Sequence, residues 1–232
     1  MDTQRESIRT SNFRNYYFLE QGIKVTVPIS KFMLELNRLI KNLAHGKLAS
    51  YHVHEDSLYE SIKSELGYFL PDSDLVLIKN PYPKMKPRRE TDISIRNMSN
   101  LDEDRSSGEI NCSHFIEIKS IFHNEKLPQK DIDDDLDKLS DATKMYGAIG
   151  IFIIVGLNHD LNRRKRSLAK LGKLGEEFLP FSVTTYTGKE VWLLPAGSYT
   201  TDDPNVYVWE VSYQNDFHKR KSSFEFAAFQ YN

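Results

Sequence analysis

The sequence feature that most constrains the fold of this chain is a pair of neighbouring strand patterns in which charged residues stand among apolar ones. Residues 90–95 and 114–122 alternate apolar and polar side chains, which is typical of half-buried β-strands. Side chains two positions apart lie on one face of a strand, so Glu117 and Lys119 point the same way. Asp92, on the first strand, faces them if the two strands pair with that side in common. The patterns therefore predict two carboxylates and one ammonium group at one point of a sheet.

The chemistry of this point follows from the same residues. Glu117-Ile118-Lys119 is the only acid-x-Lys triplet in the chain, and it lies in an apolar strand, where charges are costly unless they are paired or used. Carboxylate oxygens are the ligands that Mg²⁺ prefers, and an ion held by two carboxylates plus waters is a common arrangement in enzymes. The other interpretation is a cross-strand ion pair of Lys119 with Asp92 or Glu117.

This stretch resembles the PD-(D/E)xK nuclease superfamily, which includes many restriction endonucleases. The family carries an acid at the start of one strand and, after a variable gap, an acid-x-Lys triplet on the next. Here Asp92 and then Glu117 to Lys119 meet that pattern, although Thr91 stands in place of the proline and residues 96–113 lengthen the gap. The resemblance covers the middle part of the chain. It implies an α/β fold with a restriction-endonuclease-like core, in which helices flank a central mixed β-sheet.

The apolar periodicity around the motif is typical of such a fold. Spacings of three and four predict helices, and short apolar runs predict strands; the helices are expected at residues 30–46, 56–69, 131–146 and 160–178, and the strands at 75–78 and 148–157. One of these helices separates the Glu117 strand from the continuous apolar strand that follows it. A strand, a helix and a strand in this order predict a right-handed parallel crossover.

The last third of the chain is rich in strand patterns. It contains four segments of this kind, at residues 181–187, 190–194, 205–213 and 223–231. They form a β-rich C-terminal extension that either widens the sheet or makes a lobe that grips the substrate. The expected organisation is an N-terminal arm or cap (residues 1–29), a nuclease-like α/β core (residues 30–178) and the β-rich part (residues 179–232).

The resemblance also implies a function. By it, the chain would be a Mg²⁺-dependent endonuclease of the type II restriction kind that hydrolyses phosphodiester bonds in double-stranded DNA, with Mn²⁺ as a substitute metal. Asp92 and Glu117 would bind the metal, and the Ile118 carbonyl would be a further ligand. Lys119 would orient or help to deprotonate the attacking water. Many relatives are dimers, which lets two sites cut both strands, so a homodimer is expected.

Two alternatives to this function remain open from the sequence. One is a non-catalytic DNA-binding or interaction module on the same fold, and the other is a nuclease of repair or recombination. A non-catalytic module would retain DNA without metal-dependent cutting, and replacement of Lys119 would not affect it.

A glutamate on the helix before the core is a further metal ligand in many members of the family. Glu60 is the candidate here, and Glu65 is the second choice. Both also fit ordinary solvated positions on a helix, which is the more common role of a single glutamate.

Two groups of basic residues could contact a phosphate backbone. One lies on the proline-rich segment just before Asp92, and the other lies on the helix expected after residue 160. Their members are Lys84, Lys86, Arg88 and Arg89 in the first group and Arg163, Arg164, Lys165 and Arg166 in the second. A solvated turn and a solvated helix face are the alternatives.

Composition narrows the class of protein. The chain has 31 Lys and Arg residues against 33 Asp and Glu residues, so a DNA-binding surface requires an uneven distribution of charge. The single cysteine, Cys112, excludes a disulfide framework and is typical of a reducing cytoplasm. The longest apolar run, residues 148–157, is too short to span a bilayer. The sequence therefore predicts a cytoplasmic protein without a membrane partner.

Overall fold

The computed structural model describes ten segments of the chain. They are residues 13–18, 23–28, 31–48, 54–70, 74–81, 89–97, 112–122, 126–174, 179–199 and 203–217. No helix in these segments is long and apolar enough to cross a membrane.

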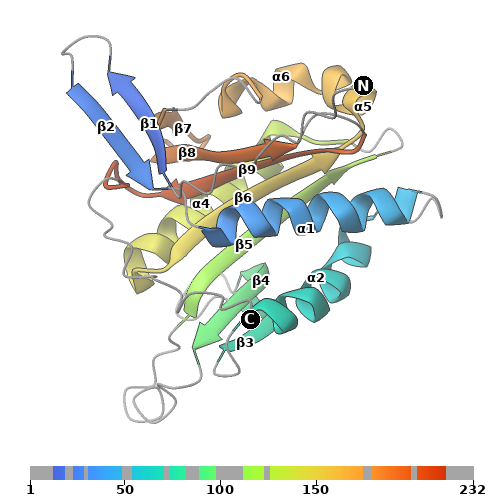
Figure 1. Ribbon diagram of the computed structural model, residues 1–232. Coiled ribbons are helices and arrows are strands. Elements are labelled where there is room, and N and C mark those ends of the chain that lie inside the picture. Colours follow the sequence, from blue (N-terminus) through green and yellow to red (C-terminus); the bar gives the residue numbers. More distant parts are fainter. Residues whose placement is uncertain are drawn as a thin grey trace, which may run out of the picture.

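A seven-stranded mixed sheet forms the centre of the molecule, with the strand order β3-β4-β5-β6-β9-β8-β7 (Figure 1). Only β5 and β6 run parallel; the other neighbouring pairs in this sheet are antiparallel. The strands are β3 (Asp74–Pro81), β4 (Glu90–Asn97), β5 (Cys112–Ile121), β6 (Ile149–Gly156), β7 (Phe181–Thr184), β8 (Glu190–Tyr199) and β9 (Asn205–Ser212). A separate two-stranded sheet pairs β1 (Phe13–Phe18) with β2 (Ile23–Pro28).

Helices cover both faces of the large sheet (Figure 1). The helix α1 (Lys31–Leu48) packs over β6, β8 and β9, and α2 (Glu55–Phe69) packs beside it over β3, β4 and β5. On the opposite face, α4 (Gln129–Tyr146) packs against β5, β6, β8 and β9. The α/β class, with a mixed sheet flanked by helices, is therefore confirmed.

The alternation of β5 divides its side chains between two hydrophobic cores. Ile116 and Ile118 belong to the core beneath α1 and α2, whereas Phe115 and Ile121 belong to the core beneath α4. Glu117 and Lys119 share the second face because they have the same parity as Phe115. The period of the strand thus directs both charges toward α4.

The unit formed by β5, α4 and β6 is the predicted parallel crossover. The helix begins after Pro128, whose extended backbone ends the preceding segment, and it ends at Gly147, which has a left-handed φ of 64°. The two strands are in register from His114 opposite Ile149 to Ile121 opposite Gly156. The crossover places the first turns of α4 over the second half of β5.

Three expectations about the elements were wrong in detail. Gly46 does not end α1, which continues to Leu48; a single glycine costs only about 1 kcal/mol in a helix. Pro195 does not end β8, because a register shift after it accommodates the proline. Residues 160–178 do not form one helix.

The chain after β6 forms three short helical pieces in place of that one helix. They are α5 (Asn158–Arg163), α6 (Lys165–Leu168) and the 3₁₀ helix η2 (Ala169–Leu171). Arg164 leaves the helical region, with a φ of −99° and a ψ of 12°, and Gly172 has a left-handed φ of 74°.

The C-terminal strand patterns resolve in favour of a wider sheet. β9 pairs with β6, and β8 and β7 follow it, so these three strands continue the central sheet. The pattern at residues 223–231 lies outside the described residues.

A buried histidine on β5 should make the stability of the fold depend on pH. Burial lowers the pKa of His114 from its ordinary value of 6.5 to about 3. Between these two values the unfolded chain binds a proton that the folded chain does not, so stability is lost as the pH falls below 6.5. From pH 7 to pH 5 we expect His114 to lower the free energy of unfolding by about 2 kcal/mol.

Urea denaturation across this pH range measures the effect, with His114→Asn as the comparison. The readout is the slope of stability against pH, which should be flatter in the variant even if the variant is less stable throughout. Equal slopes would show that His114 is not the source.

Candidate functional site

The candidate site lies where β4 separates from β5. The backbone pairing of the two strands starts at Ile93 opposite Ile116. Before that pair, side chains replace the ladder: the Thr91 hydroxyl donates to the carbonyl oxygens of Ile93 (3.0 Å) and Ile116 (3.2 Å). The Ile118 N–H donates to Oδ2 of Asp92 at 2.8 Å. These bonds fix the Asp92 carboxylate beside the middle of β5.

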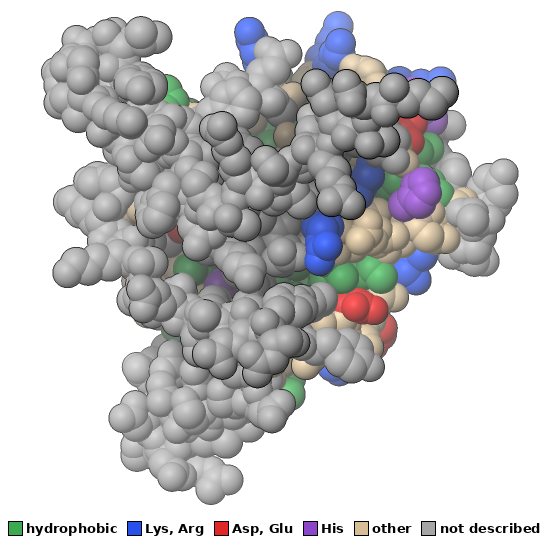
Figure 2. Space-filling view, viewed as in Figure 1, with side chains coloured by type: hydrophobic (Ala, Val, Ile, Leu, Met, Phe, Trp, Pro, Cys, Tyr) green, Lys and Arg blue, Asp and Glu red, His purple; other side chains and the backbone are tan. Residues whose placement is uncertain are grey.

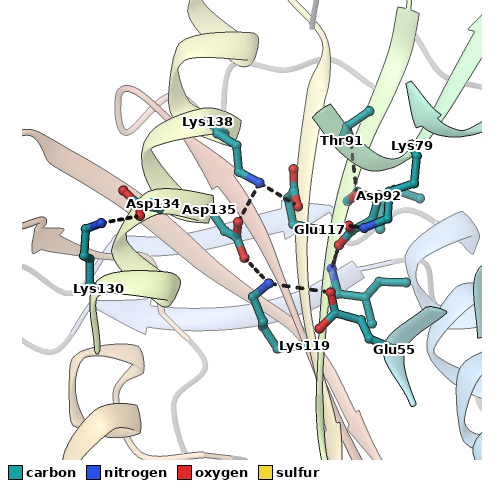
Figure 3. Close-up of polar contacts among 12 residues, drawn as sticks. Glu55, Lys79, Thr91, Asp92, Glu117, Lys119, Lys130, Asp134, Asp135 and Lys138 are labelled. Carbon is teal, nitrogen blue, oxygen red and sulfur yellow. Dashed lines mark hydrogen bonds and ion pairs between the residues drawn. The ribbon is translucent and has the colours of Figure 1, made fainter. Parts of the chain in front are cut away.

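The three residues of the predicted motif come together here (Figure 3). Continuing the pairing of Ile93 with Ile116 by one residue puts Asp92 opposite Glu117. Lys119 is two residues further along β5 on the same face. The three groups also act on one another electrostatically, because Asp92 contributes to raising the pKa of Glu117 and Lys119 contributes to lowering that of Asp92.

Four further charged side chains join them, and the sequence patterns did not identify any of these. On one side, Lys79 of β3 approaches Oδ1 of Asp92 to 2.8 Å. On the other side, the α4 ammonium group of Lys138 lies 3.0 Å from Oε2 of Glu117. We call the whole set the charge cluster: Glu55, Lys79, Asp92, Glu117, Lys119, Asp135 and Lys138.

Asp135 is the centre of the α4 side of the cluster (Figure 3). Its Oδ1 lies 2.6 Å from the Lys138 ammonium group, and its Oδ2 lies 2.8 Å from that of Lys119. The side chain of Asp135 is 5% exposed, so both ion pairs form largely out of water. One aspartate on α4 therefore holds both lysines that lie next to Glu117.

Tyr59 of α2 connects Glu55 and Lys79 on the opposite side. Its hydroxyl donates to Oε1 of Glu55 at 2.6 Å and accepts from the Lys79 ammonium group at 3.2 Å. The Lys79 nitrogen also lies 4.4 Å from the centre of the Tyr59 ring, which is within the range of a cation–π contact. Glu55 in turn is 3.6 Å from the Lys119 ammonium group.

The two predicted metal-binding acids are in opposite electrostatic states. Burial pushes the pKa of Asp92 up, but the Ile118 N–H and Lys79 outweigh burial, so this pKa lies below its usual range. Glu117 is 1% exposed. Its pKa is raised well above the usual range, first by burial and then by Asp135 and Asp92, against the effect of Lys138. Glu117 is therefore a carboxylate that an additional cation would stabilise.

Lys119 is a stable cation. Burial acts to lower its pKa, but Asp135 and Glu55 outweigh burial and raise this pKa above its ordinary value. Lys119 therefore stays protonated at neutral pH, which suits a hydrogen-bond donor and not a general base.

A surface pocket of about 420 Å³ opens beside the cluster. Its lining combines residues that precede and begin β4, Lys119 of β5 and the first turns of α4; these are Arg89, Glu90, Lys119, Asp131, Asp134, Asp135 and Lys138. The Lys119 side chain is 18% exposed, whereas Asp92 and Glu117 are buried. Of the three motif residues, Lys119 is thus the one that reaches the pocket.

The donor chemistry of the cluster fits a hard divalent cation, although the described residues contain no preformed metal site. No group of three or more His, Cys, Asp or Glu side chains in the described segments has the geometry to hold a metal ion. Asp92 and Glu117 are neighbouring carboxylates of the kind that Mg²⁺ prefers. Lys79 and Lys138 pair with them here, so an ion would have to compete with both ammonium groups.

Glu60, the candidate for a third carboxylate, is exposed on α2, and Glu65 is partly buried. The carboxylate of α2 that contacts Lys119 is Glu55. Five residues of helix turn by about 140° beyond a full turn, so Glu55 and Glu60 project in different directions. Acidic residues are common in the first turn of a helix for the sake of its dipole, so the sequence alone gave Glu55 no distinguishing signal. Ile118 contacts the cluster through its N–H, which donates to Asp92.

The predicted DNA-binding residues fall into three sets. Lys84, Lys86 and Arg88 lie outside the described residues. Arg89 is half-buried and lines the pocket. In the second basic group, Arg164 is half-buried and the others are exposed on α5 and α6; these are Arg163, Lys165 and Arg166. Figure 2 shows Lys and Arg side chains projecting at the top of the view, where Figure 1 places these helices.

Comparison with known proteins identifies no relative. No protein-family model, curated protein or solved structure matches this chain. What can be said of function therefore rests on the residue pattern and on the geometry of the charge cluster.

Loss of the ion pair between Glu117 and Lys138 should strongly lower the stability of the fold. Lys138→Met leaves a buried carboxylate without this counter-ion, and we expect it to lower the free energy of unfolding by about 3 kcal/mol at neutral pH. The loss should shrink as the pH is lowered, because a protonated Glu117 needs no counter-ion. Chemical denaturation between pH 5 and pH 8 measures both effects.

Lys130→Met is the matched control on the same helix. Its ammonium group is 3.7 Å from Asp134 and its side chain is 68% exposed, so we expect a loss of less than about 0.5 kcal/mol. Adding Glu117→Gln to Lys138→Met should recover part of the lost stability, because Asp135 also loses Lys138 and keeps only Lys119. Equal losses in the two lysine variants would contradict the buried pair.

Proposed function

We propose that this protein is a Mg²⁺-dependent endonuclease that hydrolyses phosphodiester bonds in DNA through Asp92, Glu117 and Lys119. The observation that carries the proposal is the meeting of these three side chains where β4 separates from β5. Glu117 and Lys119 pair with Lys138 and Asp135 of α4, and a surface pocket opens beside Lys119. The arrangement of β4, β5, α4 and β6 around them supports a restriction-endonuclease-like core.

Each residue has a distinct role in this proposal. Asp92 and Glu117 hold the ion, and the Ile118 carbonyl is a further candidate ligand. When bound, Mg²⁺ would lower the pKa of a water molecule and offset charge on the phosphate. Lys119, fixed by Asp135 and Glu55, donates a hydrogen bond to the water or to a phosphate oxygen. Because its pKa is raised, Lys119 orients the water and leaves deprotonation to another group.

DNA as the substrate is supported by the placement of positive charge. Arg89 lines the pocket next to the cluster, and Arg163, Lys165 and Arg166 are exposed on a second surface. Double-stranded DNA, a homodimer that cuts both strands and a type II restriction role are the specific form of the proposal. Mn²⁺ is expected to substitute for Mg²⁺.

A second candidate function is a non-catalytic DNA-binding or interaction module. The observation that favours it is the pairing of Asp92 with Lys79 and of Glu117 with Lys138. In this alternative the lysines neutralise the carboxylates permanently and take the place of an ion. Binding of DNA would then be independent of Mg²⁺, and replacement of Lys119 would not change it.

Cleavage of supercoiled plasmid in the presence of Mg²⁺ tests the proposal. We expect wild-type protein to nick or linearise the plasmid, and Asp92→Asn and Lys119→Met to be slower by about 100-fold or more. Lys144→Met, an exposed charge change in the last turn of α4, should cut like wild type. Equal rates for all four proteins, or no cutting by any, would refute the mechanism.

Thermal unfolding with and without Mg²⁺ gives a readout that does not depend on activity. The ion should raise the Tm of wild-type protein, since a ligand that binds only the folded state stabilises it. It should raise the Tm of Asp92→Asn much less. Equal shifts would mean that the ion binds elsewhere, and retention of DNA in EDTA without any cutting would favour the non-catalytic module.

A further inference from the structure

The turn between β7 and β8 presents an exposed aromatic ring next to the pocket. Tyr186, in this turn, is 55% exposed. Its hydroxyl donates to Oδ1 of Asp134 at 2.5 Å, and Asp134 lines the pocket. The hydrogen bond to Asp134 raises the pKa of Tyr186, and the Lys130 ammonium group lies 5.9 Å from the centre of the ring.

Acidic residues of α4 hold this turn in place at one-turn intervals. The Tyr186 N–H donates to Oδ2 of the buried Asp133 at 2.8 Å. One turn later the Thr187 hydroxyl donates to Oδ2 of Asp137 at 2.7 Å, and after another turn Lys189 pairs with Asp141 at 2.7 Å. Because the turn is already ordered, a ligand that binds there pays little additional conformational entropy. A preorganised aromatic side chain therefore contributes more to affinity.

The pocket beside Tyr186 offers groups for both parts of a nucleotide. Arg89 lines the pocket, and its Nη1 has no hydrogen-bond partner among the described residues; a phosphate in the pocket would supply an acceptor for this guanidinium group. Glu90 and Asp131 are exposed carboxylates on the pocket wall, and carboxylates accept hydrogen bonds from the amino groups of bases. Because the lining carries both positive and negative charges, it fits a base together with its phosphate better than it fits a phosphate alone.

We propose that this pocket is a nucleotide subsite in which Tyr186 stacks on an unpaired base next to the phosphate that is cut. Arg89 contacts the phosphate of the same nucleotide. The inference rests on the proposed nuclease chemistry, and it replaces the intact duplex of the restriction role with DNA that is open beside the cut. Bases in a duplex already stack on one another, so the subsite favours DNA that is open beside the cleavage point, at a single strand, a flap or a frayed end.

Binding of single-stranded DNA in EDTA tests the subsite apart from catalysis. The probe is an oligonucleotide with 2-aminopurine at successive positions, because stacking quenches the fluorescence of this base. Wild-type protein should quench at least one position. Tyr186→Leu should abolish the quench and weaken binding, measured by anisotropy, by about 5- to 100-fold, which corresponds to the usual energy of stacking a base on an aromatic ring.

Two variants serve as controls. Tyr186→Phe keeps the ring and loses only the bond to Asp134, so it should retain the quench. Tyr213→Leu removes another exposed tyrosine, just after β9, and should bind within about twofold of wild type because surface changes outside a site have small effects. Binding to a blunt duplex should change less than binding to the single strand.

The outcomes separate this inference from the proposed function. No quench at any position in wild-type protein, or equal single-strand binding by wild type and Tyr186→Leu, would overturn the subsite even if the protein cuts plasmid. An equal loss for duplex and single strand would overturn the preference for open DNA. Failure of wild-type protein to bind or cut any DNA would overturn the proposed function, and the subsite with it.

Discussion

The neutralisation of two buried carboxylates is the constraint on which the rest of the structure depends. Asp92 and Glu117 lie on adjoining strands with little access to water, and a buried carboxylate is tolerated only when it is paired and hydrogen-bonded. Lys79 of β3 serves the first and Lys138 of α4 serves the second. The ammonium groups therefore connect the edge of the sheet, its centre and the covering helix. In the proposed function the same carboxylates would hold a divalent cation, so the groups proposed for catalysis are also groups whose charge the fold must compensate.

The helix α4 connects the charge cluster and the turn between β7 and β8 because of its period. Asp135 and Lys138 project toward β5 and fix the lysine of the motif. Asp133, Asp137 and Asp141, spaced one turn apart, project toward the turn between β7 and β8. Residues on different faces of one rigid helix keep a fixed relation to each other. Asp135 and Lys138 of the charge cluster and Asp134, which accepts from the Tyr186 hydroxyl, thus line one pocket, and the proposed nucleotide subsite uses this arrangement.

The elements that could be predicted are those whose signal lies within a few residues. Local periodicity predicts the strands around Asp92 and Glu117, the helices α1, α2 and α4, and the parallel crossover through α4. The structure contains each of these elements. The errors occurred where packing overrides a local signal. The helix expected at residues 160–178 is broken into pieces, and β8 passes through Pro195 because a register shift absorbs it. The choice between a wider sheet and a separate lobe was also decided by packing, since β9 inserts beside β6.

The sequence by itself determined that Glu117 and Lys119 share a face, because the period of a strand is a property of the backbone. It also made Asp92 the natural partner across the next strand. Only the tertiary structure decided which charges neutralise them. Lys79, Lys138, Asp135 and Glu55 come from β3, α4 and α2, and nothing in their local sequence distinguishes them from solvated residues. Ion pairs between elements depend on how the elements pack and on how much water they exclude. That is a property of the assembled fold, and it is why the carboxylate of α2 at the site is Glu55 and not Glu60.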